Sequence, residues 1–567
     1  MAKAARETRT ESGKRAGKFV AALKSVGVKE NNILDSVGAS DEINASISGV
    51  NSLGVPEKLA HLYGELGSGS ESVALTKVLL DSVNRYESAH NQECPPDLIE
   101  QACHVAYQNT FDGYRESMRS AGFLDSASNM MPDNTALQAN RAIVSIQNTF
   151  FTAVPWIVSV PTDIGSGLGK LIIVDHVASA KLGGYALSGS MDGVNSGSRF
   201  FSSNRITETA NSTEGAHTGQ LTSIQLTSET CETVDNGATA VKLIKGRAVV
   251  YVLGRPIAYE VNKTDTVSTV SGSVTLSGTT YQIGGTINND TGEIALTSTP
   301  ALANGVTVLV ESHIDFNRQP ELIGEMGVIV TPYEFLANPI RGTVSVGIDA
   351  STQLSNEISL DPLTNLMGAM QRQLGNEKHY NALHYARRLA KNNTASLDIS
   401  LWLDTGAQTR SQNIQDISIP LQALSQQMAI DTNSTGITHL YVGKVVKSWL
   451  NSLILGGRFV PSGIRDQAGI HRVGTLDGLY EIYYSPDQPE TTSGGVTAAT
   501  ILCIGQSIDI ARSGIVTGQA VSPIILPIGN TREMQQGTSY FERSFMRVNP
   551  HLPSSNSFAE LTLTGLK

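Results

Sequence analysis

The sequence predicts an α+β protein built from several compact units. Its 567 residues allow about three or four domains at roughly 100–200 residues each. Three regions with different sequence patterns support the prediction. They are a polar helical first part, a Thr- and Val-rich middle with strand-like alternation, and a long helix that is followed by mixed strands and helices. Helices and strands that occupy separate stretches of one chain are typical of the α+β class.

The first 135 residues are predicted to form a helical arm. Two stretches, Pro56–Leu66 and Ser72–Tyr86, carry apolar residues at three-to-four spacing, and Lys18–Leu23 is a short amphipathic turn. A Gly-Ser break at residues 67–70 separates the longer two. Because helices this short are marginal alone in water, we expect residues 1–135 to form an extended arm that lies on partners rather than a domain with its own core.

Residues 136–217 are predicted to contain strands and a long loop. Apolar and β-branched runs at Ala153–Val160 and Lys170–Val177 predict two strands. Residues 178–217 are rich in Gly, Ser and Asn, and a loop of this length is usually functional or disordered. We therefore expect 178–217 to be a functional, exposed loop or hairpin.

A small all-β unit is predicted over residues 218–320. Thr, Ser and Val alternate through short segments bounded by Gly, Asn or Asp. The clearest signal is Gly285–Leu296, where two alternating stretches flank a polar turn that ends in glycine. This pattern predicts a β-hairpin.

The longest predicted helix begins at Asp361-Pro362. Asp is a favourable N-cap, and proline fits the first helical turn. Apolar residues follow at helical spacing: Leu363, Leu366, Met367, Met370 and Leu374. We expect a helix of about 45 Å that runs to Lys391, with Gly375-Asn376 as the point where it could kink or divide.

Beyond residue 396 the sequence predicts alternating strands and helices. The predicted elements are a strand at Thr438–Val442, a helix at Lys444–Leu455, a hairpin over Val473–Tyr484 that turns at Asp477-Gly478, and strands at Thr500–Ile504, Ser539–Val548 and Phe558–Thr564.

Composition excludes several classes of protein. No stretch approaches the ~20 apolar residues that a membrane-spanning helix needs. The polar start lacks a secretory core, so we expect a chain that is made and kept in a cytoplasm. The four cysteines are too widely spaced for a disulfide scaffold, and we expect reduced, mostly buried thiols.

Charge is unevenly distributed. The formal net charge is −11, yet residues 1–29 hold eight Lys/Arg and two Glu, a charge of +6, which leaves −17 for the remainder. An acidic body repels nucleic acid. The basic segment is either a solvated terminus or an arm that touches phosphates or an acidic partner.

The known motifs for catalysis, cofactor binding and metal binding do not match the sequence, which offers no candidate residue for any of them. We therefore expect no enzymatic activity and no cofactor. Gly165–Lys170 hints at a phosphate loop, but Ile164 and Leu171 stand where Gly and Ser or Thr are required. His379 and His384 are five residues apart, too far for a zinc pair on one helix face, and are expected at the surface or at an interface.

The order of these elements resembles the major capsid protein of tailed bacteriophages. Leu363–Ala390 is similar to that family's spine helix, and Thr438–Val442 with its following helix is similar to the core of the axial domain. Val473–Tyr484, followed by Ser485-Pro486-Asp487, resembles the family's glycine-turn hairpin and its corner. Residues 503–527 resemble the segment that returns to the peripheral domain.

The resemblance implies a Hong Kong-type phage capsid fold with an inserted β domain. The implied parts are a helical N-terminal arm (1–135), peripheral strands with the extended loop (136–217), the insertion (218–320), the peripheral domain with the spine helix (321–396), the axial domain (397–530) and closing peripheral strands (531–567).

The implied function is structural: pentamers and hexamers of the chain form the icosahedral head that encloses a tailed phage's double-stranded DNA. The implied partners are other copies of the chain, with scaffold, portal and decoration proteins, and packaged DNA only weakly through the basic arm; no membrane is implied. The implied location is the virion capsid, assembled in the bacterial host cytoplasm.

Two alternatives remain open. One is another phage assembly protein, such as a contractile tail sheath. The other is a host- or glycan-binding protein that uses the β insertion, although aromatic residues make up only 6% of the chain.

Overall fold

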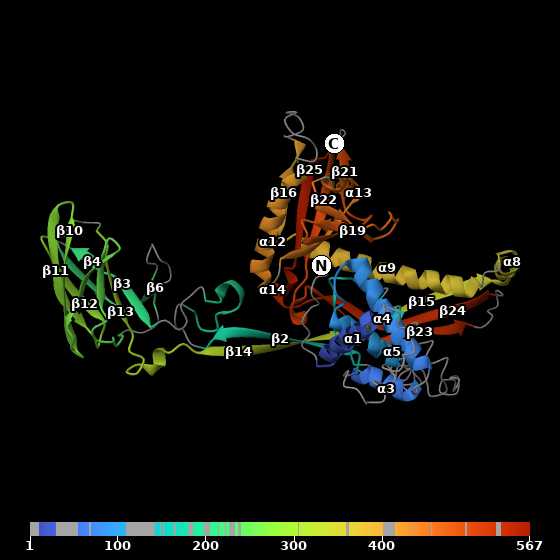
Figure 1. Ribbon diagram of the computed structural model, residues 1–567, viewed down its shortest axis with the longest axis horizontal. Coiled ribbons are helices and arrows are strands. Elements are labelled where there is room, and N and C mark those ends of the chain that lie inside the picture. The colour runs from blue at the N-terminus through green and yellow to red at the C-terminus, as the bar shows by residue number, and fades with distance from the viewer. Residues whose placement is uncertain are drawn as a thin grey trace. The chain divides into compact units, whose positions relative to one another are not determined.

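The computed structural model is α+β and divides into two compact units, residues 1–173 with 332–567 and residues 174–331 (Figure 1). No helix among the described residues is long and apolar enough to span a membrane. The structure describes residues 11–566 except for 30–54, 67–69, 109–141, 144, 148, 151, 161, 164–165, 180–184, 198–203, 214, 222, 226–232, 236–239, 304–305, 359–361, 401–413, 435, 455, 494–495 and 529–534.

The N-terminal helices pack around a core of their own. They are α1 (Glu11–Lys29), α3 (Glu57–Leu66), α4 (Ser70–His90) and α5 (Pro96–Gln108). Their apolar faces meet in one cluster that includes Phe19, Leu62 and Leu79, each at most 2% exposed. The extended arm expected from the sequence is therefore not what these residues form. Each helix is short, but together they bury enough apolar surface to stabilise one another.

A four-stranded sheet carries the longest helix. The strand order is β1-β23-β24-β15, with β1 at Val158–Ser159, β23 at Ile515–Ile528, β24 at Gln535–Val548 and β15 at Asn338–Gly347. Helix α8 (Ile348–Ile358) follows β15, and α9 (Pro362–Ala390) comes next. The long helix predicted from the sequence is confirmed, and it continues through Gly375 and Asn376 without dividing (Figure 1). Asp361, its predicted N-cap, lies outside the described residues.

An eight-stranded mixed sheet forms the second layer of the same unit. Its order is β16-β25-β22-β17-β20-β19-β18, with β21 paired to β22. The bounds are Thr394–Asp398 for β16, Ile437–Val442 for β17, Phe459–Pro461 for β18, His471–Leu476 for β19, Tyr480–Tyr484 for β20, Glu490–Ser493 for β21, Val496–Gly505 for β22 and Phe558–Leu566 for β25. Helices α12 (Ser418–Thr432), α13 (Lys444–Leu450) and α14 (Leu552–Ser555) accompany the sheet.

Strands that are neighbours in the sequence belong to different sheets. Of the two closing strands, β24 pairs with β23 and β15, whereas β25 pairs with β22 and β16. β23, which covers part of the segment that resembles the return to the peripheral domain, belongs to the four-stranded sheet. The predicted hairpin at Asp477-Gly478 is present as β19 and β20, with positive φ at both turn residues. The predicted helix at 444–455 ends at Leu450, and a 3₁₀ turn follows over Asn451–Leu453.

Two long strands form a separate two-stranded sheet, and its Phe335 stacks on Phe545 of β24. They are β2 (Leu168–Ala178) and β14 (Met326–Leu336). Both strands run through the boundary between the two units. We call this pair the ribbon.

The unit of residues 174–331 is a nine-stranded sheet wrapped around an apolar core. Its order is β3-β13-β8-β9-β10-β11-β12-β5-β4. The bounds are Arg205–Thr209 for β3, Asn211–Thr213 for β4, Ala216–Gln220 for β5, Val249–Val252 for β8, Arg255–Asn262 for β9, Val267–Leu276 for β10, Thr279–Asn288 for β11, Glu293–Thr299 for β12 and Val308–His313 for β13. A small pair, β6 (Ser223–Gln225) with β7 (Thr233–Asp235), completes it.

The inserted β unit predicted from the sequence is present, and its hairpin at 285–296 is confirmed as β11 and β12. Its first strand starts at Arg205, before the expected boundary at residue 218. The end of the expected loop at 178–217 is therefore part of the sheet, through β3, β4 and the start of β5. The sequence signal was weak here because β3 to β5 are short and polar.

A stripe of alanines lets α9 approach the two sheets closely. Ala382, Ala386 and Ala390 repeat at helical spacing, are fully buried and share a cluster with Trp156 and Phe558. We expect Ala386→Leu to lower the free energy of unfolding by about 1–3 kcal/mol through overpacking. Thermal melting of the full chain measures it, with the exposed Asn381→Leu as the control. Equal melting temperatures for the two variants would contradict this packing.

Candidate functional site: a buried junction and an exposed ribbon

A buried aromatic cluster joins α9 to the eight-stranded sheet and to the segment before β1. The Trp156 indole donates to the Tyr441 hydroxyl at 3.0 Å, and the His379 Nε2 lies 2.9 Å from the same oxygen. The rings of Tyr441 and Tyr483 stack at 5.3 Å. Burial raises the pKa of Tyr441, so its hydroxyl stays protonated and can serve both partners. His379, expected at the surface or at an interface, is half-buried in this cluster.

The end of α4 reaches the same cluster. His90 Nδ1 lies 2.7 Å from the Tyr483 hydroxyl, although the two residues are 393 positions apart. Asn91 donates to Glu481 at 3.4 Å, and Glu481 pairs with Arg472 at 2.8 Å. Burial together with the nearby His379 and Arg472 lowers the pKa of His90 to about 3, and burial lowers the pKa of His379 to about 4. Both imidazoles are therefore neutral at pH 7, and we call this set of residues the histidine junction.

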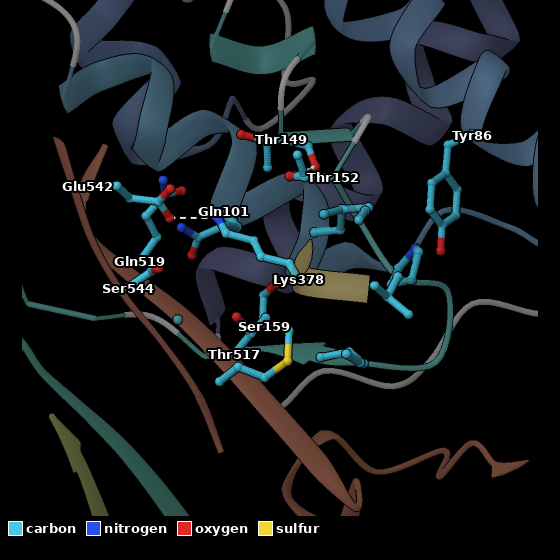
Figure 2. Close-up of a pocket in the computed structure, with 17 residues that line it drawn as sticks. Tyr86, Gln101, Thr149, Thr152, Ser159, Lys378, Thr517, Gln519, Glu542 and Ser544 are labelled. Atoms are coloured by element: carbon cyan, nitrogen blue, oxygen red, sulfur yellow. Dashed lines mark hydrogen bonds and ion pairs between the residues drawn. The ribbon is translucent and has the colours of Figure 1, made fainter. Parts of the chain in front are cut away.

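A pocket with about 660 Å³ of open space lies between α5, the segment before β1, α9 and strands β23 and β24. Figure 2 shows Lys378 reaching across it to Glu542, with Gln101 and Ser544 nearby. Lys378 Nζ lies 2.7 Å from Glu542 Oε1, and the Glu542 side chain is 1% exposed. Burial alone would raise the pKa of Glu542, but the charge of Lys378 and hydrogen bonds from Lys378, Tyr540 and Ser544 hold it below its usual value. This buried ion pair therefore links α9 to the four-stranded sheet.

Lys378 and Glu542 are the charged residues among the described residues that line the pocket. Among the described residues there is no group of three or more His, Cys, Asp and Glu side chains that could hold a metal ion. Its carboxylate is neutralised by Lys378, and the remaining lining residues are hydroxyls, amides and apolar side chains. The ion pair holds α9 against the four-stranded sheet.

The structure also locates the phosphate-loop candidate, the cysteines and the basic segment that the sequence singled out. Asp163 accepts hydrogen bonds from the Ser166 amide at 2.8 Å and from its hydroxyl at 2.6 Å, while residues 164–165 of the phosphate-loop candidate lie outside the described residues. Cys94, Cys103 and Cys503 are buried free thiols, while Cys231 lies outside the described residues. Of the basic segment, Lys14, Arg15 and Lys18 are exposed on α1, and residues 1–10 lie outside the description.

The ribbon exposes large apolar side chains. Val328, Val330 and Leu336 are 59%, 57% and 63% exposed, and Met326, Ile329 and Ile172 are also exposed. Exposed apolar residues occur at consecutive positions of β14, so both faces of the ribbon carry them. A two-stranded ribbon is only marginally stable in water, and contiguous exposed apolar surface marks an interaction site. The sequence signal was the apolar run 326–330, which lacks the period of two that marks a half-buried strand.

Comparison with known proteins gives matches only among solved structures. No family model and no curated protein matches the chain. The chain is similar to a capsid chain of jumbo bacteriophage PhiKZ, with TM-score 0.38 and 10% identity over 73% of this chain and 92% of that one. It is similar to an encapsulin chain of Synechococcus elongatus, with TM-score 0.25 and 16% identity over 42% and 77%. It is also similar to a capsid chain of cyanophage Pam1, with TM-score 0.27 and 9% identity over 44% and 78%.

Proposed function

We propose that the chain is a shell-forming structural subunit, the major capsid protein of a tailed phage head. The observation that carries the proposal is the ribbon, whose exposed apolar side chains need a covering surface that the chain itself does not supply among its described residues. A neighbouring copy supplies such a surface in a closed assembly. Low charge density supports the same reading, because charged residues are depleted in interface cores and make up only 16% of this chain.

We further propose roles for the parts. The eight-stranded sheet corresponds to the axial domain around five- and six-fold axes, and the four-stranded sheet with α9 corresponds to the peripheral domain. The ribbon, rather than residues 178–217, takes the place of the extended loop that overlaps a neighbour. The nine-stranded unit is the insertion. Scaffold, portal and decoration proteins remain proposed partners, together with weak contact between the basic N-terminal segment and DNA.

The ribbon provides the test of this function. We expect Val328→Lys and Val330→Lys to abolish closed shells, because a charge placed in an apolar contact without a partner is strongly unfavourable. The measurement is negative-stain electron microscopy of the full chain co-expressed with its neighbouring genes. Wild-type protein should form pentameric or hexameric rings and polyhedral shells.

The matched control is Leu253→Lys, which replaces a residue of similar exposure, 56%, in the turn between β8 and β9. It should leave assembly intact, and all three variants should melt as the wild type does. Normal shells from the Val328 and Val330 variants would show that no neighbour covers the ribbon. Wild-type tubes without ring-shaped capsomers would favour a tail sheath, and a persistent wild-type monomer would overturn the shell proposal.

A further inference from the structure

The pocket between α5, α9 and the four-stranded sheet has the size and the lining of a small-molecule site. Its open space of about 660 Å³ lies within the roughly 300–1,000 Å³ that is typical of ligand pockets. Leu98, Ile157 and Met546 give it apolar walls. Figure 2 shows Tyr86 at the end of the pocket opposite Glu542. The pocket therefore combines one charged, hydrogen-bonding end with an apolar remainder.

Gln101 on α5 brings an unused hydrogen-bond donor to this pocket. Its side chain lines the pocket and is 7% exposed, and its Nε2 has no hydrogen-bond partner among the described residues. Asp97 lies one helical turn earlier and accepts from the Ser159 amide at 2.9 Å through Oδ2, while its Oδ1 also has no partner among the described residues. The two buried side chains thus do not satisfy each other. A buried donor without an acceptor is unfavourable and needs an explanation.

The same end of the pocket has further donors to offer. An ammonium group carries three N–H donors, and the contact of Lys378 with Glu542 at 2.7 Å uses one of them. The Glu542 carboxylate is occupied by hydrogen bonds from Lys378, Tyr540 and Ser544. An oxygen acceptor of a ligand would therefore find partners at this end. The acceptor should be uncharged, because a carboxylate would meet the negative charge of Glu542.

Hydroxyl groups in the wall can accept hydrogen bonds in turn. Thr149 donates its hydroxyl proton to the Ser145 carbonyl at 2.9 Å, and Thr517 donates to the Phe545 carbonyl at 2.9 Å. A hydroxyl that donates to the backbone keeps its oxygen lone pairs as acceptors. The pocket thus offers donors for a carbonyl oxygen and acceptors for an N–H group, which is the pattern of an amide.

We propose that this pocket binds a small uncharged molecule in which an amide is attached to an apolar ring or chain. The amide oxygen accepts from Gln101 Nε2, and the apolar part lies against the walls. Such a ligand contacts α5, α9 and the four-stranded sheet together, so it stabilises the folded chain when bound. The site goes beyond the proposed function, because it lies within one chain and does not require a closed shell.

Binding of benzamide to the full chain tests the site. Benzamide has the proposed chemistry, and benzoate has the same shape with a negative charge. Saturation-transfer NMR of the two compounds measures their affinities. We expect a Kd on the order of 1 mM for benzamide, as is reasonable for so small a ligand, and about tenfold weaker binding of benzoate. Gln101→Met keeps the length of the side chain but removes the donor, and should weaken benzamide binding about tenfold.

Two other glutamines provide matched controls. Gln422→Met changes an exposed residue of α12 and should alter neither affinity nor melting temperature. Gln92 is 3% exposed, and its Nε2 donates to the Tyr86 hydroxyl at 3.0 Å and to the Pro155 carbonyl at 3.1 Å. Gln92→Met should therefore lower the melting temperature of the free chain, whereas Gln101→Met should not, because the Gln101 donor has no bond to lose.

A wild-type experiment keeps the test independent of any variant. A benzamide that carries a diazirine group should, on irradiation, label peptides that contain Leu98, Ile157 or Met546, and excess benzamide should suppress the labelling. The proposal would be overturned by labelling elsewhere, by benzoate binding as tightly as benzamide, or by unchanged affinity of Gln101→Met. An equal loss of melting temperature in Gln101→Met and Gln92→Met would also overturn it, by showing that Gln101 is already bonded within the fold.

The results also separate this site from the shell function. Normal shells from a chain that does not bind benzamide would overturn the pocket proposal alone. A chain that binds benzamide in the expected way but stays a monomer would support the pocket while overturning the shell function.

Discussion

Replacing Lys378 with methionine should lower the free energy of unfolding by about 3–5 kcal/mol, because it leaves the carboxylate of Glu542 buried without its cation. Glu542 is 1% exposed and depends on Lys378 at 2.7 Å. Methionine keeps most of the side-chain volume, so the loss reports charge rather than packing. Chemical denaturation of the full chain at pH 7, followed by circular dichroism, measures the loss.

Two controls separate the buried pair from ordinary surface charge. Adding Glu542→Gln to Lys378→Met removes the unpaired charge and should restore most of the lost stability. Lys391→Met breaks the pair with Glu560 at 2.8 Å, in which the lysine is 66% exposed, and should cost less than about 1 kcal/mol. Equal losses for Lys378→Met and Lys391→Met would show that the Glu542 site is wetter than its burial indicates.

The sequence predicted the elements that are specified by residues close together in the chain. The helix at 362–390 was visible from its first-turn proline and its apolar spacing, and the hairpins at 285–296 and 473–484 from their turn residues. Strand partners were not predictable in the same way. β24 and β25 are similar in texture and close in sequence, yet they join different sheets, because pairing depends on which distant strand offers a matching edge.

The functional features were harder to predict for the same reason. His90 and Tyr483 meet across 393 positions, and a single histidine on a helix gives no sign of a distant partner. The compact N-terminal core was missed because each amphipathic helix was considered alone, whereas the stability comes from four of them burying one another's apolar faces. One strand of the ribbon, β2, was predicted from the apolar and β-branched run at Lys170–Val177. The other strand, β14, was not predicted, because its apolar residues follow neither a helical period nor a period of two.

The histidine junction should make the subunit sensitive to mild acid. The pKa of His90 is held at about 3 and that of His379 at about 4, against 6.5 for an unburied histidine. Between pH 6.5 and about 4 these histidines therefore bind protons in the unfolded chain but not in the folded chain. The free energy of unfolding then decreases as the pH falls. Each histidine is expected to contribute a loss of about 2–3 kcal/mol over that interval.

The groups around the histidine junction explain why His90 and His379 have lowered pKa values. His90 faces the Tyr483 hydroxyl, the Tyr86 ring, His379 and the guanidinium of Arg472, while His379 faces the Tyr441 hydroxyl. A proton on either ring would sit in a buried site, and for His90 the neighbouring Arg472 and His379 would add repulsion. The lowered pKa of Glu542 acts in a different window, since its contribution is lost only as pH falls below 4.5 and through its own folded value.

Melting temperatures between pH 7.5 and pH 4 test this assignment. The His90→Gln/His379→Gln double variant keeps side chains that can hydrogen-bond but cannot titrate, so its stability should change far less than that of the wild type above pH 4.5. His384→Gln, on the exposed side of α9 next to Asp487, should retain the wild-type pH dependence. If the double variant lost stability as steeply as the wild type, carboxylates rather than the histidine junction would govern acid sensitivity. A flattened profile would instead identify neutral His90 and His379 as what holds α4, α9 and the eight-stranded sheet together.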